Sequence, residues 1–115
     1  MEHPAFTLSW TDFMKVEMRT GTIIRAEVFE EAKKPAYKLW IDFGESIGIK
    51  KSSAQITRLY TPEILLGKQV IAVINFPPKQ IATLKSECLV LGAMDGDAIT
   101  LLSPDKPVVN GLRIG

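Results

Sequence analysis

Polar side chains that can bind an anion or an amide gather where two apolar stretches are interrupted. An apolar run ends at Asn75, and Lys79, Lys85 and Ser86 precede the next apolar run. Lysine ammonium groups bind phosphate, while amide and hydroxyl groups both donate and accept hydrogen bonds. Two prolines at 77–78 cannot donate a strand hydrogen bond, so they should stiffen a loop that carries Lys79. This stretch is therefore either only a turn or the rim of a binding site.

Groups for catalysis or metal binding are scarce in this sequence. The only histidine is His3, near the N-terminus, and the only cysteine is Cys88, inside an apolar stretch. They cannot complete a Ser-His-Asp triad, a structural metal site or an internal disulfide. Asp95 and Asp97 flank a glycine, and a turn explains them better than acid–base chemistry. We therefore expect a binding protein, not an enzyme, with no cofactor and no metal.

Charge is unevenly distributed along the chain, although the net charge is only +1. Residues 33–85 hold nine basic and three acidic residues, whereas the flanks hold five basic and ten acidic residues. Such a basic middle suits a one-sided anionic ligand such as a nucleic-acid backbone. The alternative is that these lysines only keep loops solvated.

The length of 115 residues indicates one domain, 1–115, and the hydrophobic fraction of 46% is typical of folded proteins. The apolar runs are too short for a membrane span, and the first residues do not resemble a secretory signal. Together with the single cysteine, these features indicate a cytoplasmic protein that is not inserted in a membrane.

The periodicity of apolar residues predicts short strands and two short helices. Strands are expected at 18–28, 38–43, from 47–49 onward, at 69–75, 85–93 and 97–103, with helices at 11–15 and from Pro62 to Gly67. Gly21, inside the first strand, predicts a bulge or bend, and Asp95-Gly96 predicts a hairpin turn. This order predicts an all-β fold, a small Greek-key barrel of the oligonucleotide-binding (OB) type with two short helices.

Six blocks of the sequence, in order, carry a resemblance to a known family. They are RTGTII (19–24), AYKLWIDFG (36–44), KKSSAQI (50–56), GKQVIAVINFPP (67–78), KSECLVLGA (85–93) and PVVNGLRIG (107–115). Together they resemble the tRNA-binding domain family, which includes domains appended to methionyl-tRNA synthetases. The resemblance implies an OB-fold barrel that binds tRNA by shape. Its stand-alone members are homodimers, and one group of them is described as protein-export chaperones for unfolded or precursor polypeptides.

The same resemblance implies roles for particular residues. Lys38, Asn75 and Ser86 fit the family pattern, whereas Leu89 stands where the pattern has a methionine. The residues expected to contact tRNA or polypeptide are Lys38, Lys51, Ser53, Asn75, Phe76, Lys79, Lys85, Ser86 and Leu89. Phe76 or Trp40 would stack on a base, or alternatively pack within a strand. Which of the two ligands is physiological stays open at this point.

Two apolar segments predict a homodimer. Trp10, Phe13 and Met14 recur at helical spacing, and the tail carries Val108, Val109, Leu112 and Ile114. A small barrel has little room to bury both segments, so we expect these seven residues at a dimer interface.

Overall fold

The computed structural model describes residues 6–115, so His3 lies outside the described residues. The helices are α1 (Trp10–Lys15) and α2 (Pro62–Leu65). The strands are β1 (Met18–Val28), β2 (Tyr37–Asp42), β3 (Ile49–Ala54), β4 (Gln69–Val73), β5 (Lys79–Ile81), β6 (Leu84–Ser86), β7 (Leu89–Val90), β8 (Gly92–Asp95) and β9 (Ala98–Leu101).

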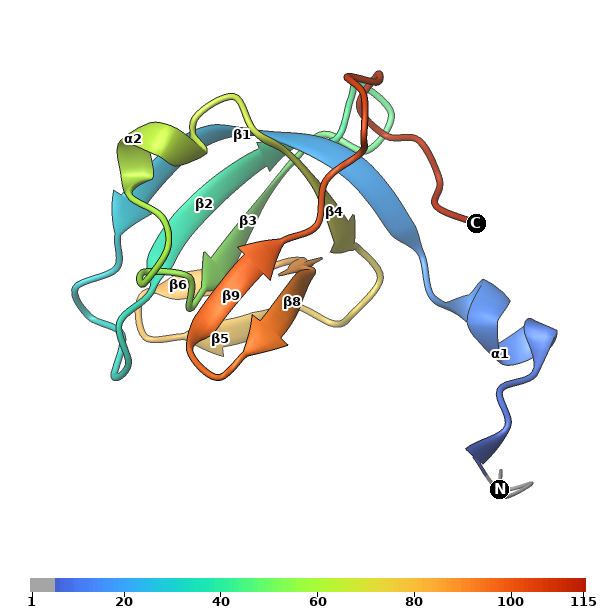
Figure 1. Cartoon of the computed structure of the whole chain (residues 1–115), viewed down its shortest axis with the longest axis horizontal. Coiled ribbons are helices and arrows are strands. Elements are labelled where there is room, and N and C mark those ends of the chain that lie inside the picture. The colour runs from blue at the N-terminus through green and yellow to red at the C-terminus, as the bar shows by residue number, and fades with distance from the viewer. Residues whose placement is uncertain (1–5) are drawn as a thin grey trace.

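The sheet that forms the barrel has the strand order β3-β2-β1-β4-β7. The long strand β1 pairs with β4 through its first half and with β2 through its second half, changing partners at Thr22. Three successive antiparallel strands, followed by a fourth that returns beside the first, make a Greek key. The chain curls into a nearly closed barrel (Figure 1), which confirms the predicted OB-fold.

The segment 86–88 closes the barrel between its two edge strands, β3 and β7. The backbone N–H of Glu87 donates to the Lys51 carbonyl (2.7 Å), and the Lys51 N–H donates to Oε1 of Glu87 (3.0 Å). The buried Ser52 hydroxyl donates to the Cys88 carbonyl (2.9 Å). We call this junction the seam, because backbone and side-chain bonds replace a regular strand pairing there.

The main core lies inside the barrel. Strand β2 alternates strictly, and Leu39 and Ile41 are fully buried, as is Phe43 just after it. The core consists of Ile23, Tyr37, Leu39, Ile41, Phe43, Ile56, Leu65, Val70, Ala72 and Cys88. Leu65 comes from α2, so this short helix plugs one end of the barrel.

A second, smaller hydrophobic cluster lies outside that core, and we call it the hairpin cluster. It contains Phe29, Ala36 and Leu84, with Ala32 and Ile81 packed against them. The cluster joins the loop 29–36 to the two-stranded hairpin of β5 and β6. The Thr83 hydroxyl also donates to Oε1 of Glu31 (3.2 Å), so the two segments are tied by polar and apolar contacts.

The segment 85–93 is not the single strand that its apolar pattern predicted. It is divided among β6, β7 and β8, because the chain turns at Glu87–Cys88 to close the seam. Lys79 is also not in a loop. It begins β5, where it lies opposite Ser86 of β6. The hairpin of β8 and β9 forms as predicted, with Gly96 at a left-handed φ of +61°.

Of the two roles predicted for Gly21, a bulge or a bend, the bulge is not found there. The pairing irregularity of β1 lies between Ile23 and Arg25, not at Gly21. A Cβ on Gly21 would stand 2.6 Å from Ile41 Cγ2 and 2.8 Å from the Phe43 ring. Glycine is therefore needed because the opposite side chains pack directly on the backbone.

Both predicted helices are present. Ser9 caps α1 by accepting a hydrogen bond from the Asp12 N–H (3.1 Å), and Pro62 begins α2. No residue of α1 is buried, and the helix stands away from the barrel (Figure 1). Within the described part of the chain, neither helix is long and apolar enough to cross a membrane.

Candidate functional site at the barrel seam

A pocket of about 300 Å³ opens on the outside of the seam, and we call it the seam pocket. It brings together five of the nine residues expected to bind tRNA or polypeptide: Ser53, Phe76, Lys79, Ser86 and Leu89. Phe76 and Leu89 are 55% and 47% exposed, so their apolar surfaces face solvent. Phe76 therefore does not pack inside a strand, which was the alternative expected from its sequence context.

Four further residues line the seam pocket and were not expected from the sequence. They are Pro77, Ile81, Glu87 and Cys88. Glu87 is the notable one, because it places a carboxylate among hydroxyl and ammonium groups. The sequence carried no signal for it, since its position depends on how residues 86–88 close the barrel.

Backbone pairing explains why residues distant in the sequence meet here. Lys38 of β2 lies opposite Ser53 of β3, and the Ser53 N–H donates to Oγ of Ser86 (3.3 Å). Ser86 in turn lies opposite Lys79. Paired residues point to the same face of a sheet, so these four side chains form a continuous polar row across the seam.

Lysines on this side of the barrel differ in how strongly their charge is neutralised. Lys38 has an ion pair with Glu27 (3.7 Å), and its Nζ lies 5.6 Å from the centre of the Phe29 ring. Within residues 6–115, no carboxylate forms an ion pair with Lys79 or Lys51. These two ammonium groups are therefore better able than Lys38 to bind a phosphate group, as are Lys33 and Lys34, which also lack an ion pair within that range.

Trp40 lies on the outer face of β2, between Arg25 of β1 and Lys51 of β3. The Arg25 guanidinium stands 4.3 Å from the centre of the indole ring, within cation–π range. Arg25 thus covers the Trp40 ring, which lies outside the barrel core. Trp40 is therefore neither an open surface for stacking on a base nor a buried residue of the core.

Four of the nine expected residues do not line the seam pocket: Lys38 and Lys51, on the neighbouring strands β2 and β3, and Asn75 and Lys85. The Asn75 side chain accepts from the Glu17 N–H (3.0 Å) and donates to the Lys15 carbonyl (2.6 Å). Asn75 therefore fastens the end of α1 to the barrel. Lys85 neighbours Ser86 along β6 and so points to the opposite face of the hairpin.

The Cys88 thiol is protected from reaction. Burial raises the pKa of Cys88 to about 12, despite a hydrogen-bonding contact from Ser52 and the charge of Lys50, which lower it. The thiol therefore stays protonated at neutral pH, and a protonated thiol is neither a nucleophile nor a metal ligand. No group of three or more potential metal ligands occurs among residues 6–115.

The two segments expected at a dimer interface approach each other at the end of the tail. Arg113 donates to the Met14 carbonyl (3.0 Å), which brings the C-terminal tail beside α1. Trp10 is 83% exposed and Val109 69% exposed, and Met14 and Leu112 are exposed as well. Phe13, Val108 and Ile114 are half-buried. The structure thus brings the end of the tail beside α1, whereas Val108 lies against Gln69 of β4.

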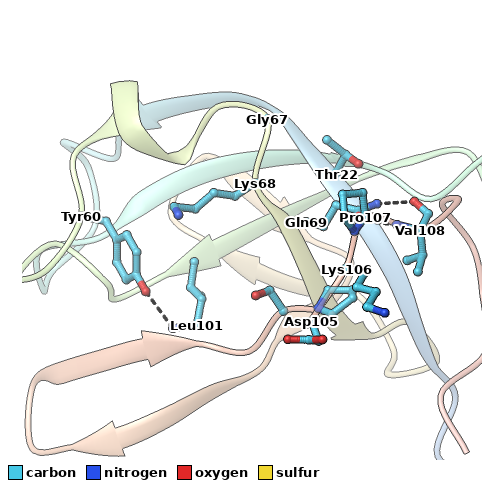
Figure 2. Close-up of a pocket in the computed structure, with 12 residues that line it drawn as sticks. Thr22, Tyr60, Gly67, Lys68, Gln69, Leu101, Asp105, Lys106, Pro107 and Val108 are labelled. Carbon is cyan, nitrogen blue, oxygen red and sulfur yellow. Dashed lines mark hydrogen bonds between the residues drawn. The ribbon is translucent and has the colours of Figure 1, made fainter.

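A second hollow, of about 510 Å³, lies on another side of the barrel (Figure 2). Tyr60 accepts from the Leu101 N–H (3.0 Å) at one end of it. At the other end the Gln69 side chain both donates to the Val108 carbonyl (2.7 Å) and accepts from the Val108 N–H (2.9 Å). None of the nine expected ligand-contacting residues lines this hollow. One of its walls is the segment 103–108, which Gln69 binds through Val108.

Comparison with known proteins points to the same family as the sequence blocks. The model of a family described as a tRNA binding domain matches residues 18–113. The methionine–tRNA ligase of Thermococcus kodakarensis is 34% identical over 107 residues, which is 93% of this chain. The chain spans only 14% of the length of that ligase.

Two solved structures are similar over nearly their whole length. The chaperone CsaA of Bacillus anthracis is 47% identical with a TM-score of 0.90, over 95% of this chain and 99% of that one. The CsaA chaperone protein of Picrophilus torridus is 51% identical with a TM-score of 0.89, over 95% of this chain and 100% of that one.

Proposed function

Because the chain belongs to the tRNA-binding domain family, we propose that it is a non-catalytic protein that binds tRNA at the barrel seam. The single observation that carries the proposal is the seam pocket, which gathers Ser53, Phe76, Lys79, Ser86 and Leu89 from separate segments. Phosphate contacts would come from Lys79 and Lys51, and hydroxyl contacts from the two serines.

The outer face beside the pocket supports this proposal. In OB-folds, strands two and three and the loops beside them carry the nucleic-acid site. Here β2 and β3 present Lys38, Lys51 and Ser53, while loop 29–36 presents Lys33 and Lys34 beside Lys79 along an adjoining groove. Basic groups in this arrangement follow a phosphate backbone without reading its sequence.

A second candidate function is binding of non-native polypeptide, as a chaperone acting in protein export. It is favoured by the exposed apolar surfaces of Phe76 and Leu89 in the pocket. Two structural relatives are named chaperones.

The proposal extends to a cytoplasmic homodimer, joined through α1 and the C-terminal tail, because a dimer would present two seam pockets and double the basic surface.

Filter binding separates the two candidates. We expect the unchanged protein to retain tRNA on the filter, with an affinity that falls linearly on a log–log plot as salt rises. Binding of a permanently unfolded polypeptide through apolar contacts should change little with salt. If the polypeptide binds and tRNA does not at any salt concentration, the tRNA proposal is wrong and the chaperone function stands alone.

A further inference from the structure

The seam pocket holds one group that phosphate binding does not use, the carboxylate of Glu87. A carboxylate repels phosphate, so its presence beside Lys79 would weaken a site built for phosphate alone. A carboxylate accepts hydrogen bonds but does not donate them when ionised. Glu87 therefore suits an occupant that brings N–H donors into the pocket.

The structure holds Glu87 in a defined position. Its backbone N–H donates to the Lys51 carbonyl (2.7 Å), and its Oε1 accepts from the Lys51 N–H (3.0 Å). Among the described residues, no side chain pairs with the other carboxylate oxygen, Oε2. Glu87 is thus anchored by one oxygen while the second is left for a ligand.

Apolar and cationic groups surround this acceptor. Phe76 and Leu89 offer exposed apolar surface, and the Lys79 ammonium has no ion-pair partner in residues 6–115. The pocket, about 300 Å³, is at the lower end of the roughly 300–1,000 Å³ that small-ligand sites span. It is therefore of a size for one small ring system, not for a duplex.

We propose that the seam pocket takes one unpaired nucleobase of the bound RNA. The ring lies against Phe76 and Leu89, the N–H edge of the base donates to Glu87, and the adjoining phosphate contacts Lys79. Proteins commonly bind RNA by stacking splayed-out bases on aromatic rings and hydrogen-bonding their Watson–Crick edges. This inference rests on the proposed function, since it specifies which part of the RNA enters the site.

The carboxylate also predicts which base is preferred. Guanine presents two adjacent donors, N1–H and the N2 amino group, whereas adenine and cytosine present one amino group beside an acceptor. Uracil has a single donor between two acceptors. We therefore expect guanine to bind best, with its two donors shared between Oε2 and the second lone pair of Oε1, whose other bond comes from the Lys51 N–H. A polypeptide would offer Glu87 single backbone N–H donors, whereas guanine presents two adjacent donors on one edge of a flat ring, so the pocket favours the base.

Nucleoside monophosphates test the assignment directly. We expect GMP to shift the NMR signals of the Leu89 methyl groups at lower concentration than AMP, CMP or UMP. Glu87→Gln keeps an oxygen for the Lys51 N–H but replaces the free acceptor with a donor. It should weaken GMP binding about tenfold and remove the preference for guanine, whereas Glu63→Gln on α2 should change nothing.

The tRNA complex provides the second arm of the test. Phe76→Ala should weaken tRNA binding about tenfold at every salt concentration, with an unchanged salt slope, since stacking releases no counterions. Ile64→Ala, which removes a similarly exposed side chain from α2, is the matched control.

Three results would overturn the inference. If tRNA binds but Phe76→Ala and Glu87→Gln have no effect, the base pocket is wrong and the tRNA proposal survives. If an unfolded polypeptide shifts the Leu89 signals and no nucleotide does, the pocket belongs to polypeptide. If the unchanged protein binds no tRNA, the proposed function fails, and the base pocket fails with it.

Discussion

Cys88 lies at the seam, and its chemistry follows from its burial. Burial raises the pKa of the thiol from the ordinary 9.0 to about 12. We expect no reaction with a thiol reagent in the native protein at slightly alkaline pH, and complete reaction after unfolding in urea. The pKa of the Cys88 thiol is higher in the folded protein than in the unfolded protein. Its contribution to the free energy of unfolding is therefore complete below pH 9.0 and is lost as pH rises toward about 12. Equal reaction rates in the folded and unfolded protein would contradict this account.

Asn75 provides a second prediction for a single residue. Its amide accepts from Glu17 N–H and donates to the Lys15 carbonyl, so it fastens α1. Asn75→Asp keeps the acceptor but places a second acceptor against the Lys15 carbonyl. We expect a loss of roughly 1–3 kcal/mol in the free energy of unfolding, measured in urea. Unchanged stability with weakened tRNA binding would instead place Asn75 in the ligand site.

Residue types and the family resemblance named several residues that the structure brings to one pocket, and their contact with a ligand stays a prediction. Lys79 and Ser86 do meet at one pocket with Phe76 and Leu89, because strand ends return to the same rim. Glu87 could not be predicted, since nothing in its type or spacing shows that its side chain closes the barrel. The role of Asn75 was equally hidden, because its two partners lie about 60 positions earlier in the chain.

At the scale of elements, the hairpin cluster determines where the basic groups stand. Leu84 is 5% exposed and packs with Phe29 and Ala36 outside the barrel core. Leu84→Ala should loosen loop 29–36 and the hairpin of β5 and β6 together, and weaken tRNA binding. Buried Leu→Ala changes cost about 2–5 kcal/mol where the site cannot collapse.

Hydrogen exchange measures that effect locally. We expect faster exchange of amides in residues 79–86, with core amides of Leu39 and Ile41 little changed, since they belong to a separate cluster. Uniformly faster exchange throughout the barrel would show that the hairpin cluster is not an independent unit.

Strand alternation and turn residues made most elements predictable, including β2, α2 and the β8–β9 hairpin. The β5–β6 hairpin was not predictable, because its turn at Ala82 and Thr83 has no glycine or asparagine. Ala82 nevertheless adopts a φ of +48°, which non-glycine residues rarely do. The hairpin cluster compensates for this conformation, and such distant packing leaves no periodic pattern in the sequence.

At the scale of the whole molecule, the apolar surface of α1 and the tail predicts a dimer. We expect light scattering at micromolar concentration to give twice the chain mass of 12.7 kDa. Trp10→Ala should shift the protein toward monomer, because Trp10 is 83% exposed on α1. Leu66→Ala, which also removes an exposed side chain, is the control. A monomer for the unchanged protein would contradict the dimer.

The most direct test of the central claim compares two lysine substitutions of equal charge. Lys79→Ala removes a cation from the seam pocket, and Lys68→Ala removes one from the hollow on the other side of the barrel. We predict that Lys79→Ala weakens tRNA binding and lowers the slope of log affinity against log salt by about one, while Lys68→Ala leaves both nearly unchanged. Equal effects of the two substitutions would contradict a tRNA site at the barrel seam.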